Sequence, residues 1–163
     1  MSMGPPTQIT PARLGDYLDV MSKAVFQTGL SWKVVAAKLA GTQAAFRNFD
    51  PEAVSNLTPA EVDELTADTR IIRNRRKIEA IMGNAARMLE LEAEHGTFQN
   101  YLRSKGGDFP ALVKDLRKNF KFMGDMGAYY FLYVVGEEVP DHKGTALDPH
   151  GVAPPTLREP RRS

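Results

Sequence analysis

Hydrophobic residues recur along most of this chain at intervals of three and four positions, which is the period of an α-helix. The first stripe consists of Leu14, Tyr17, Leu18, Met21 and Val25. Thr10 and Pro11 stand before it, and these are residue types that begin helices. The pattern therefore predicts a helix over about residues 11–27.

Capping residues divide the following sequence into further helices. Helix starts are predicted at Ser31, Asp50, Thr58, Thr97 and Asp108. Thr58 and Glu61 have the spacing of a capping box. The longest stripe begins near Ile78 and ends at Gly96, and an apolar, aromatic-rich helix is predicted over 128–135, after a hairpin at about 119–127. Because no segment requires a strand, the predicted fold class is all-α.

The periodic pattern ends at Gly136. Residues 137–163 contain five prolines and no apolar stripe. We therefore predict one helical domain over residues 1–139 and a Pro-rich C-terminal tail over residues 140–163.

Composition narrows the class of protein. No apolar run approaches the ~20 residues that span a bilayer, and the N-terminus MSMGPPTQ lacks the apolar core of a signal peptide. A cytoplasmic protein without a membrane partner is expected. The chain has no cysteine, which excludes disulfides and thiolate metal ligands.

Positive charge is concentrated in two places, although the net charge is only +1. Residues 70–77 contain five cations and no acid, and residues 114–121 contain four cations and one acid. Two basic segments in a near-neutral protein are consistent with one side of the protein that faces DNA. They are equally consistent with helix faces that are simply exposed to solvent.

Four short motifs occur in a fixed order. They are FQTGLSW at 26–32, FDPE at 49–52, IIRNRRKIE at 71–79 and FKFMGD at 120–125. In this order and spacing the chain resembles the DNA-3-methyladenine glycosylase I family of the helix-hairpin-helix glycosylase superfamily, over about residues 14–142. The resemblance implies a helix-hairpin-helix DNA glycosylase-like helical domain.

The resemblance also implies which residues contact the DNA backbone. The hairpin implies phosphate contacts from Lys118, Lys121 and the amide groups after Gly124. The basic helix adds Arg73 and Arg75. The wider superfamily has two glycines in this hairpin, and the segment Phe122-Met123-Gly124 keeps only the second. An ordinary turn between two core helices is the alternative.

The loop of the first motif resembles the segment that the family inserts into the duplex. Leu30 is the candidate wedge, with Gly29 permitting a close approach to DNA. The candidate residues of the base pocket are Trp32, Gln27 and Tyr17. Two of them are aromatic, and aromatic faces stack on a flipped base. Leu30 and Trp32 also fit ordinary core positions.

Two family features are missing. The family's pocket glutamate corresponds to Ala24, and alanine cannot hydrogen-bond a base. His142 matches one zinc-ligand histidine of the family, but the cysteine ligands are absent. No metal and no other cofactor are therefore expected.

Asp141 lies after the hairpin helix, near the position where the superfamily has its catalytic aspartate. A carboxylate there can stabilise positive charge on the sugar or orient a water molecule. The alternative, of equal weight, is that Asp141 is an ordinary residue of a helix end or a turn.

The resemblance implies a monofunctional DNA N-glycosylase of base-excision repair. Such an enzyme hydrolyses the N-glycosidic bond of an alkylated purine such as 3-methyladenine. Its partner is double-stranded DNA with a damaged base, and a monomer is expected. A non-catalytic lesion-binding module, favoured by Ala24, and a helical interaction protein without a nucleic-acid role are the alternatives.

Overall fold

The computed structural model describes residues 7–140, and these residues form helices without any strand. This confirms the predicted all-α class. The helices are α1 (Leu14–Gln27), α2 (Trp32–Ala37), α3 (Leu39–Ala45), the short 3-10 helix η1 (Arg47–Phe49), α4 (Pro51–Ser55), α5 (Pro59–Thr66), α6 (Arg75–His95), α7 (Phe98–Leu102), α8 (Phe109–Asn119) and α9 (Asp125–Val134). None of the helices in this range is long and apolar enough to cross a membrane.

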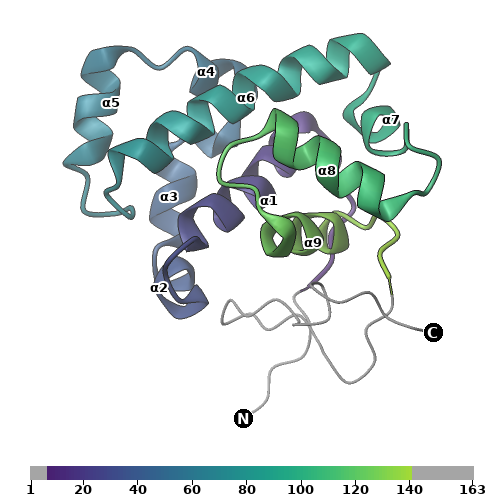
Figure 1. Cartoon of the computed structure of the whole chain (residues 1–163). Coiled ribbons are helices and arrows are strands. Elements are labelled where there is room, and N and C mark those ends of the chain that lie inside the picture. Colours follow the sequence, from purple (N-terminus) through teal and green to yellow (C-terminus); the bar gives the residue numbers. More distant parts are fainter. Residues whose placement is uncertain (1–6, 141–163) are drawn as a thin grey trace.

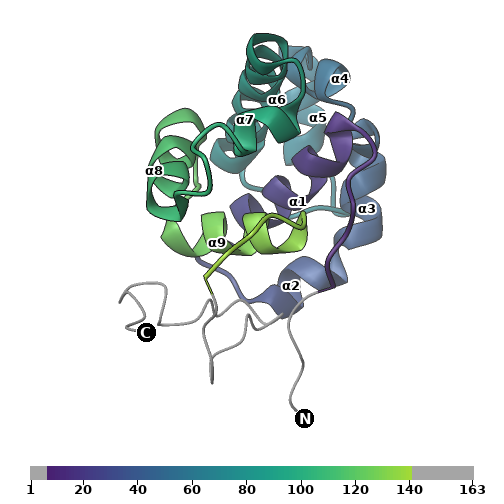
Figure 2. The ribbon, with the colours of Figure 1, turned by 90° about the vertical axis from the view of Figure 1, so that its right-hand side faces the viewer.

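Helix α1 lies at the centre of the fold, between the long helix α6 on one side and α9 on the other (Figures 1 and 2). The side chains of α1 that face these neighbours are almost completely buried, including Leu18, Met21 and Val25. This stripe is the one that the sequence pattern predicts, so the core sits where the helical period places it. Helices α8 and α9 pack as a pair and form the two arms of the hairpin.

Most predicted helix starts are confirmed. The side chains of Ser31, Asp50, Thr58, Thr97 and Asp108 each accept a hydrogen bond from a backbone N–H in the first turn of the helix that follows. The capping box of Thr58 and Glu61 is complete in both directions. These caps satisfy donors that a helix cannot pair internally, which is why they are reliable signals.

The predicted start of the first helix is wrong by about one turn. The helix begins at Leu14, because the carboxylate of Asp16 accepts hydrogen bonds from the backbone N–H groups of Ala12 and Arg13. Thr10 and Pro11 lie outside the helix. An acidic residue at the third helical position is itself a capping signal, and here it determines the start.

The predicted second helix is divided into α2 and α3 at Lys38, and a left-handed turn follows. Arg47, Asn48 and Phe49 have consecutive φ values of 53°, 54° and 56°, which non-glycine residues rarely adopt. Gly15 of α1 permits this turn, because a Cβ atom there would lie 2.8 Å from the carbonyl oxygen of Phe49. The sequence pattern contains no signal for it.

The hairpin lies between α8 and α9, within the predicted range of about 119–127. Its left-handed residue is Phe122, with a φ of 57°, whereas Gly124 has a φ of −85° that any residue can adopt. The turn therefore depends on Phe122, and the conformational freedom of Gly124 is not what forms it. The predicted helical domain over 1–139 lies almost entirely within the described residues, whereas all of the predicted tail over 140–163 except Pro140 lies outside them, so the division stays a prediction.

Candidate functional site

The loop between α1 and α2 is stabilised by its own polar contacts. The side-chain amide of Gln27 donates a 2.9 Å hydrogen bond to the carbonyl oxygen of Leu30. Gly29 has a φ of +80° and open space around its Cβ position, and the Leu30 side chain is half-buried. The loop thus exposes a short apolar tip on a fixed turn.

Lys77 of α6 anchors this loop from inside the protein. Its ammonium donates hydrogen bonds to the carbonyl oxygens of Phe26, at 2.8 Å, and Thr28, at 2.5 Å. The residue is only 4% exposed, and burial lowers the pKa of its ammonium. Lys77 belongs to the basic segment that the sequence assigns to a possible DNA face, but in the structure it fixes the end of α1.

Asn84 of α6 anchors the hairpin in the same manner. Its side-chain oxygen accepts a 2.8 Å hydrogen bond from the backbone N–H of Lys121, and its side-chain nitrogen donates to the carbonyl oxygen of Lys121 at 3.2 Å. Asn84 is 1% exposed. It lies seven residues after Lys77, so both side chains project from the same face of α6. Sequence reasoning missed Asn84, although a polar residue within an apolar helical stripe is a recognisable signal.

The outer surface of the hairpin is open and positively charged. Lys118 and Lys121 are exposed, and their side-chain ammonium groups form no hydrogen bond or ion pair with another described residue. Arg117 is paired with Asp125 across the hairpin, at 2.9 Å. A Cβ atom on Gly124 would meet no atom within 4 Å. Neither packing nor backbone conformation therefore requires a glycine at this position.

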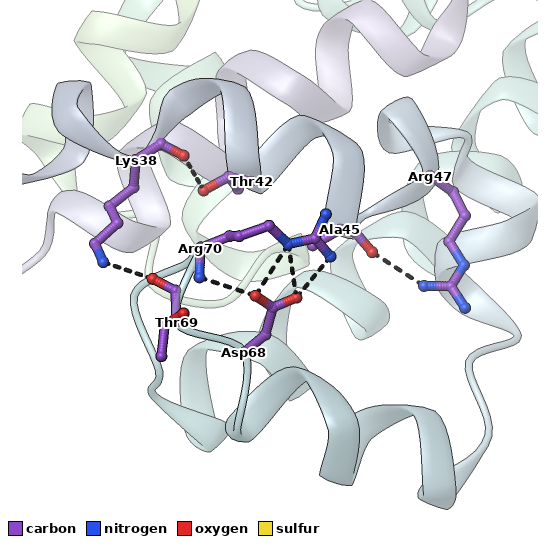
Figure 3. Close-up of polar contacts among 7 residues, drawn as sticks. All are labelled: Lys38, Thr42, Ala45, Arg47, Asp68, Thr69 and Arg70. Carbon is purple, nitrogen blue, oxygen red and sulfur yellow. Dashed lines mark hydrogen bonds and ion pairs between the residues drawn. The ribbon is translucent and has the colours of Figure 1, made fainter.

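Several cations of the basic segment 70–77 are paired with acidic neighbours. Arg70 forms a bidentate ion pair with Asp68, which holds the pKa of that carboxyl below its usual value (Figure 3). Arg75 is paired with Asp63 and Glu79. The remaining exposed cations of the segment, Arg73 and Arg76, form no such pair with a described residue. The positive surface is consequently smaller than the sequence suggests.

Trp32 is the first residue of α2 and lies directly after the loop. Its indole ring packs against the phenol ring of Tyr130 on α9, with ring centroids 4.5 Å apart and an interplanar angle of 38°. Trp32 is 9% exposed. The contact joins the loop region to the helix that follows the hairpin.

Ala24, at the position of the missing glutamate, lies in a closely packed part of the interface between α1 and α9. It is 2% exposed, and a Cβ atom on Gly127 would lie 3.6 Å from its side chain. Gly127 and Tyr130 are one turn apart on α9, so both lie along this interface. A longer side chain at Ala24 would therefore extend into the interface between α1 and α9.

Tyr17 lies two helical turns before Ala24 on α1 and is buried in an aromatic cluster. Its ring centroid is 5.0 Å from that of Phe98 and 6.2 Å from that of Phe131. Burial, with a smaller contribution from the charge of Glu137, raises the pKa of the Tyr17 hydroxyl. Tyr17 and Trp32 therefore make their ring contacts with different partners.

The remaining predicted site residue, Asp141, lies outside the described residues, as does His142. Within residues 7–140, no group of three or more histidine, aspartate or glutamate side chains has an arrangement that could hold a metal ion.

Comparison with known proteins identifies the family that shares this arrangement. The methyladenine glycosylase family model matches residues 17–111. The chain is 35% identical over 130 residues to DNA-3-methyladenine glycosylase 1 of Escherichia coli (strain K12), covering 68% of this chain and 70% of that protein. It is 31% identical over 136 residues to DNA-3-methyladenine glycosylase of Haemophilus influenzae (strain ATCC 51907 / DSM 11121 / KW20 / Rd), covering 71% and 73% of the two chains.

Solved structures agree with the sequence relatives. A crystal structure of a variant of 3-methyladenine DNA glycosylase I in complex with 3-methyladenine aligns with a TM-score of 0.71 and 25% identity. The alignment covers 80% of this chain and 81% of that structure. The likeness therefore includes most of the helical domain.

Proposed function

Because this chain belongs to the methyladenine glycosylase family, we propose that it is a DNA glycosylase of base-excision repair that releases 3-methyladenine from DNA. The observation that best supports this function is that the protein has both a loop that carries Gly29 and Leu30 and a hairpin at Gly124. Both segments are anchored on one face of α6, by Lys77 and Asn84.

The hairpin is proposed to bind the DNA backbone. Lys118 and Lys121 are free to approach phosphates, and the absence of a side chain at Gly124 allows a phosphate to reach the amide groups at the start of α9. Arg73 is equally free, whereas Arg75 would have to exchange its two carboxylate partners for a phosphate. Contacts of this type do not depend on sequence and weaken with salt.

The loop and Trp32 are proposed to extrude and receive the base. Leu30 enters the space that the flipped nucleotide leaves, and Gln27 maintains the turn that presents it. The damaged base stacks on Trp32, which favours a cationic alkylated purine. Tyr17 is buried on α1, two turns before Ala24. It stays a predicted pocket residue, and we propose that it acts through the packing of α1.

Bond cleavage requires little acid catalysis, because an alkylated purine with a positive charge is a good leaving group. The bond between the sugar C1′ and the purine nitrogen breaks, the base departs with the electron pair, and water adds at C1′. We propose that the carboxylate of Asp141 stabilises the positive charge on the sugar or orients this water. Asp141→Asn should then lower release by about 10²-fold while leaving DNA affinity unchanged.

The experiment that tests this function is release of 3-methyladenine from methylated double-stranded DNA, measured by chromatography of the free base. Leu30→Ala should lower the rate of release by at least tenfold, about 1.4 kcal/mol, because extrusion loses its wedge. Val34→Ala is the matched control, since Val34 is an apolar side chain of α2 that is 42% exposed. A wild-type protein that binds an abasic duplex and releases no base would be a lesion-binding module, and the enzyme proposal would fail.

The assembly and the location of the protein are also proposals. We infer that it acts as a monomer on double-stranded DNA, because its two proposed DNA-facing segments lie on one chain. We also propose that it acts in the cytoplasm. Sedimentation of the free protein and of an equimolar duplex complex tests the stoichiometry. A dimer that binds one duplex would contradict it.

A further inference from the structure

Tyr130 covers the aromatic surface that the proposed function assigns to the damaged base. Its ring lies 4.5 Å from the indole ring of Trp32, measured between centroids, and the two rings are in van der Waals contact. A base inserted between two aromatic rings separates them by two contact distances, or about 7 Å. The face of Trp32 that Tyr130 covers therefore cannot receive a base while Tyr130 keeps this position.

The Tyr130 ring is held by packing rather than by a hydrogen bond. Its hydroxyl has no hydrogen-bond partner among residues 7–140, and burial, reinforced by the negative charge of Asp19, raises the pKa of that hydroxyl. By contrast, the neighbouring Tyr129 donates a 2.9 Å hydrogen bond to the carbonyl oxygen of Pro140. Tyr130 can consequently leave the surface of Trp32 without breaking a hydrogen bond to the described protein.

Helices α1 and α9 pack closely, so the part of this region that can move is the side-chain ring of Tyr130. Ala24 and Gly127 have small side chains or none, and they allow the two helix backbones to approach each other. One turn further along α9, Tyr130 reaches Trp32 on α2. A base that approaches Trp32 from this side therefore meets a side chain that can rotate, and not a helix backbone.

We propose that Tyr130 closes the base-stacking face of Trp32 in the free protein and that a base stacks there only by displacing the Tyr130 ring. This proposal rests on the proposed function, because it takes Trp32 as the stacking surface. Tyr130 then lowers the apparent affinity of the site for every base by the same factor. A cationic base gains more from an aromatic face than a neutral base does, so it offsets the cost of opening more readily.

The single tryptophan of the chain allows a direct test, because Trp32 is the only source of tryptophan fluorescence. The variants are Tyr130→Ala, which removes the ring, and Tyr130→Phe, which keeps the ring and removes only the hydroxyl. Tyr130→Leu is a second opening variant if the alanine variant does not fold, as judged by circular dichroism. Each protein is examined by acrylamide quenching and is titrated with free 3-methyladenine.

We expect Tyr130→Ala to increase the quenching constant of Trp32 and to bind 3-methyladenine more tightly, while Tyr130→Phe resembles the wild type. If the wild-type site is open for a tenth of the time, removing the ring tightens binding by about tenfold. Adenine should gain by the same factor as 3-methyladenine, because the cost of opening the site is the same for both bases.

Two results would overturn the proposal. Unchanged quenching in Tyr130→Ala would mean that the ring does not cover Trp32 in solution. Increased quenching with equal or weaker binding of 3-methyladenine would mean that Tyr130 is a wall of the site and not its closure. Failure of the proposed function is seen separately, as absence of base release from methylated DNA by the wild type and by every Tyr130 variant.

Discussion

The hairpin and the region around Trp32 both include residues next to or on α9, but the hairpin is exposed to solvent, whereas Trp32 is buried. At the hairpin, Lys118 and Lys121 are exposed, and open space surrounds Gly124. By contrast, the ring of Tyr130 lies on the indole of Trp32, and Ala24 is buried at the interface between α1 and α9. The surface proposed to bind DNA is therefore preformed, whereas the surface proposed to receive the base is filled by the protein's own side chains.

This difference indicates which step of the reaction needs a conformational change. A preformed hairpin binds a phosphate without reorganisation, so its contribution depends on charge and salt. A filled pocket must be opened before the base enters, and the cost of opening reduces the apparent affinity for every base.

The largest effect is expected from Ala24→Glu, which restores the family's pocket residue in a packed interface. The longer side chain forces α1 and α9 apart and buries a carboxylate, so the free energy of unfolding should fall by at least about 3 kcal/mol. Urea denaturation measures it. The control is Ala86→Glu at an exposed position of α6, where a change within about 0.5 kcal/mol is expected.

An Ala24→Glu protein of normal stability would contradict the comparison. If that protein also released 3-methyladenine faster than the wild type, the region beside Ala24 would be an open pocket in solution. The role of the missing glutamate would then be restored by a single substitution.

A smaller effect is expected from Asn84→Ala, which removes the anchor of the hairpin. The backbone N–H and carbonyl of Lys121 lose their partner, and unfolding should become easier by about 2 kcal/mol. Affinity for duplex DNA should fall equally for all sequences, because the hairpin amides lose their fixed positions. Asn84→Asp keeps an acceptor for the N–H of Lys121 and should lose less affinity, which a fluorescence-anisotropy titration detects. Equal affinity in all three proteins would show that the hairpin does not need this anchor.

The smallest effects are expected from single cations on the proposed DNA surface. Lys118→Ala and Lys121→Ala should each reduce the slope of log affinity against log salt by about one. Arg73→Ala should weaken binding more than Arg75→Ala, since Arg75 is already paired with Asp63 and Glu79. The reverse order for the two arginines would mean that the ion pairs of Arg75 open when DNA binds.

Helix starts were predictable because each depends on a local signal. Thr58 and Asp108 cap their helices through side chains that need only the next three residues. The exception at Thr10 and Pro11 arose because Asp16 supplies a competing cap from inside the helix. The left-handed turn at Arg47–Phe49 depends on the packing of Phe49 against Gly15, which are distant in sequence, so no local pattern predicts it.

The sequence was sufficient to predict which residue types belong to the candidate site. It was not sufficient to predict their burial or their contacts in the fold. The sequence places Lys77 among the cations of a basic segment and cannot show that its side chain turns inward to the end of α1. It places Trp32 next to the loop and cannot show that Tyr130 lies on its ring, because that contact joins residues far apart in the chain. Burial and long-range partners decide such roles, and a linear pattern contains neither.

The anchoring on α6 of both segments that are proposed to face DNA restricts how the length of this helix can change. Lys77 and Asn84 share a face only because they are separated by seven residues, close to two complete turns. Deleting or inserting one residue between them rotates Asn84 by about 100° relative to Lys77 and shifts it by about 1.5 Å along the axis. The hairpin or the loop would then lose its buried partner, although every residue named in the proposed site would still be present in the chain. The spacing within α6 is therefore as much a part of the proposed DNA-binding surface as the side chains that this surface exposes.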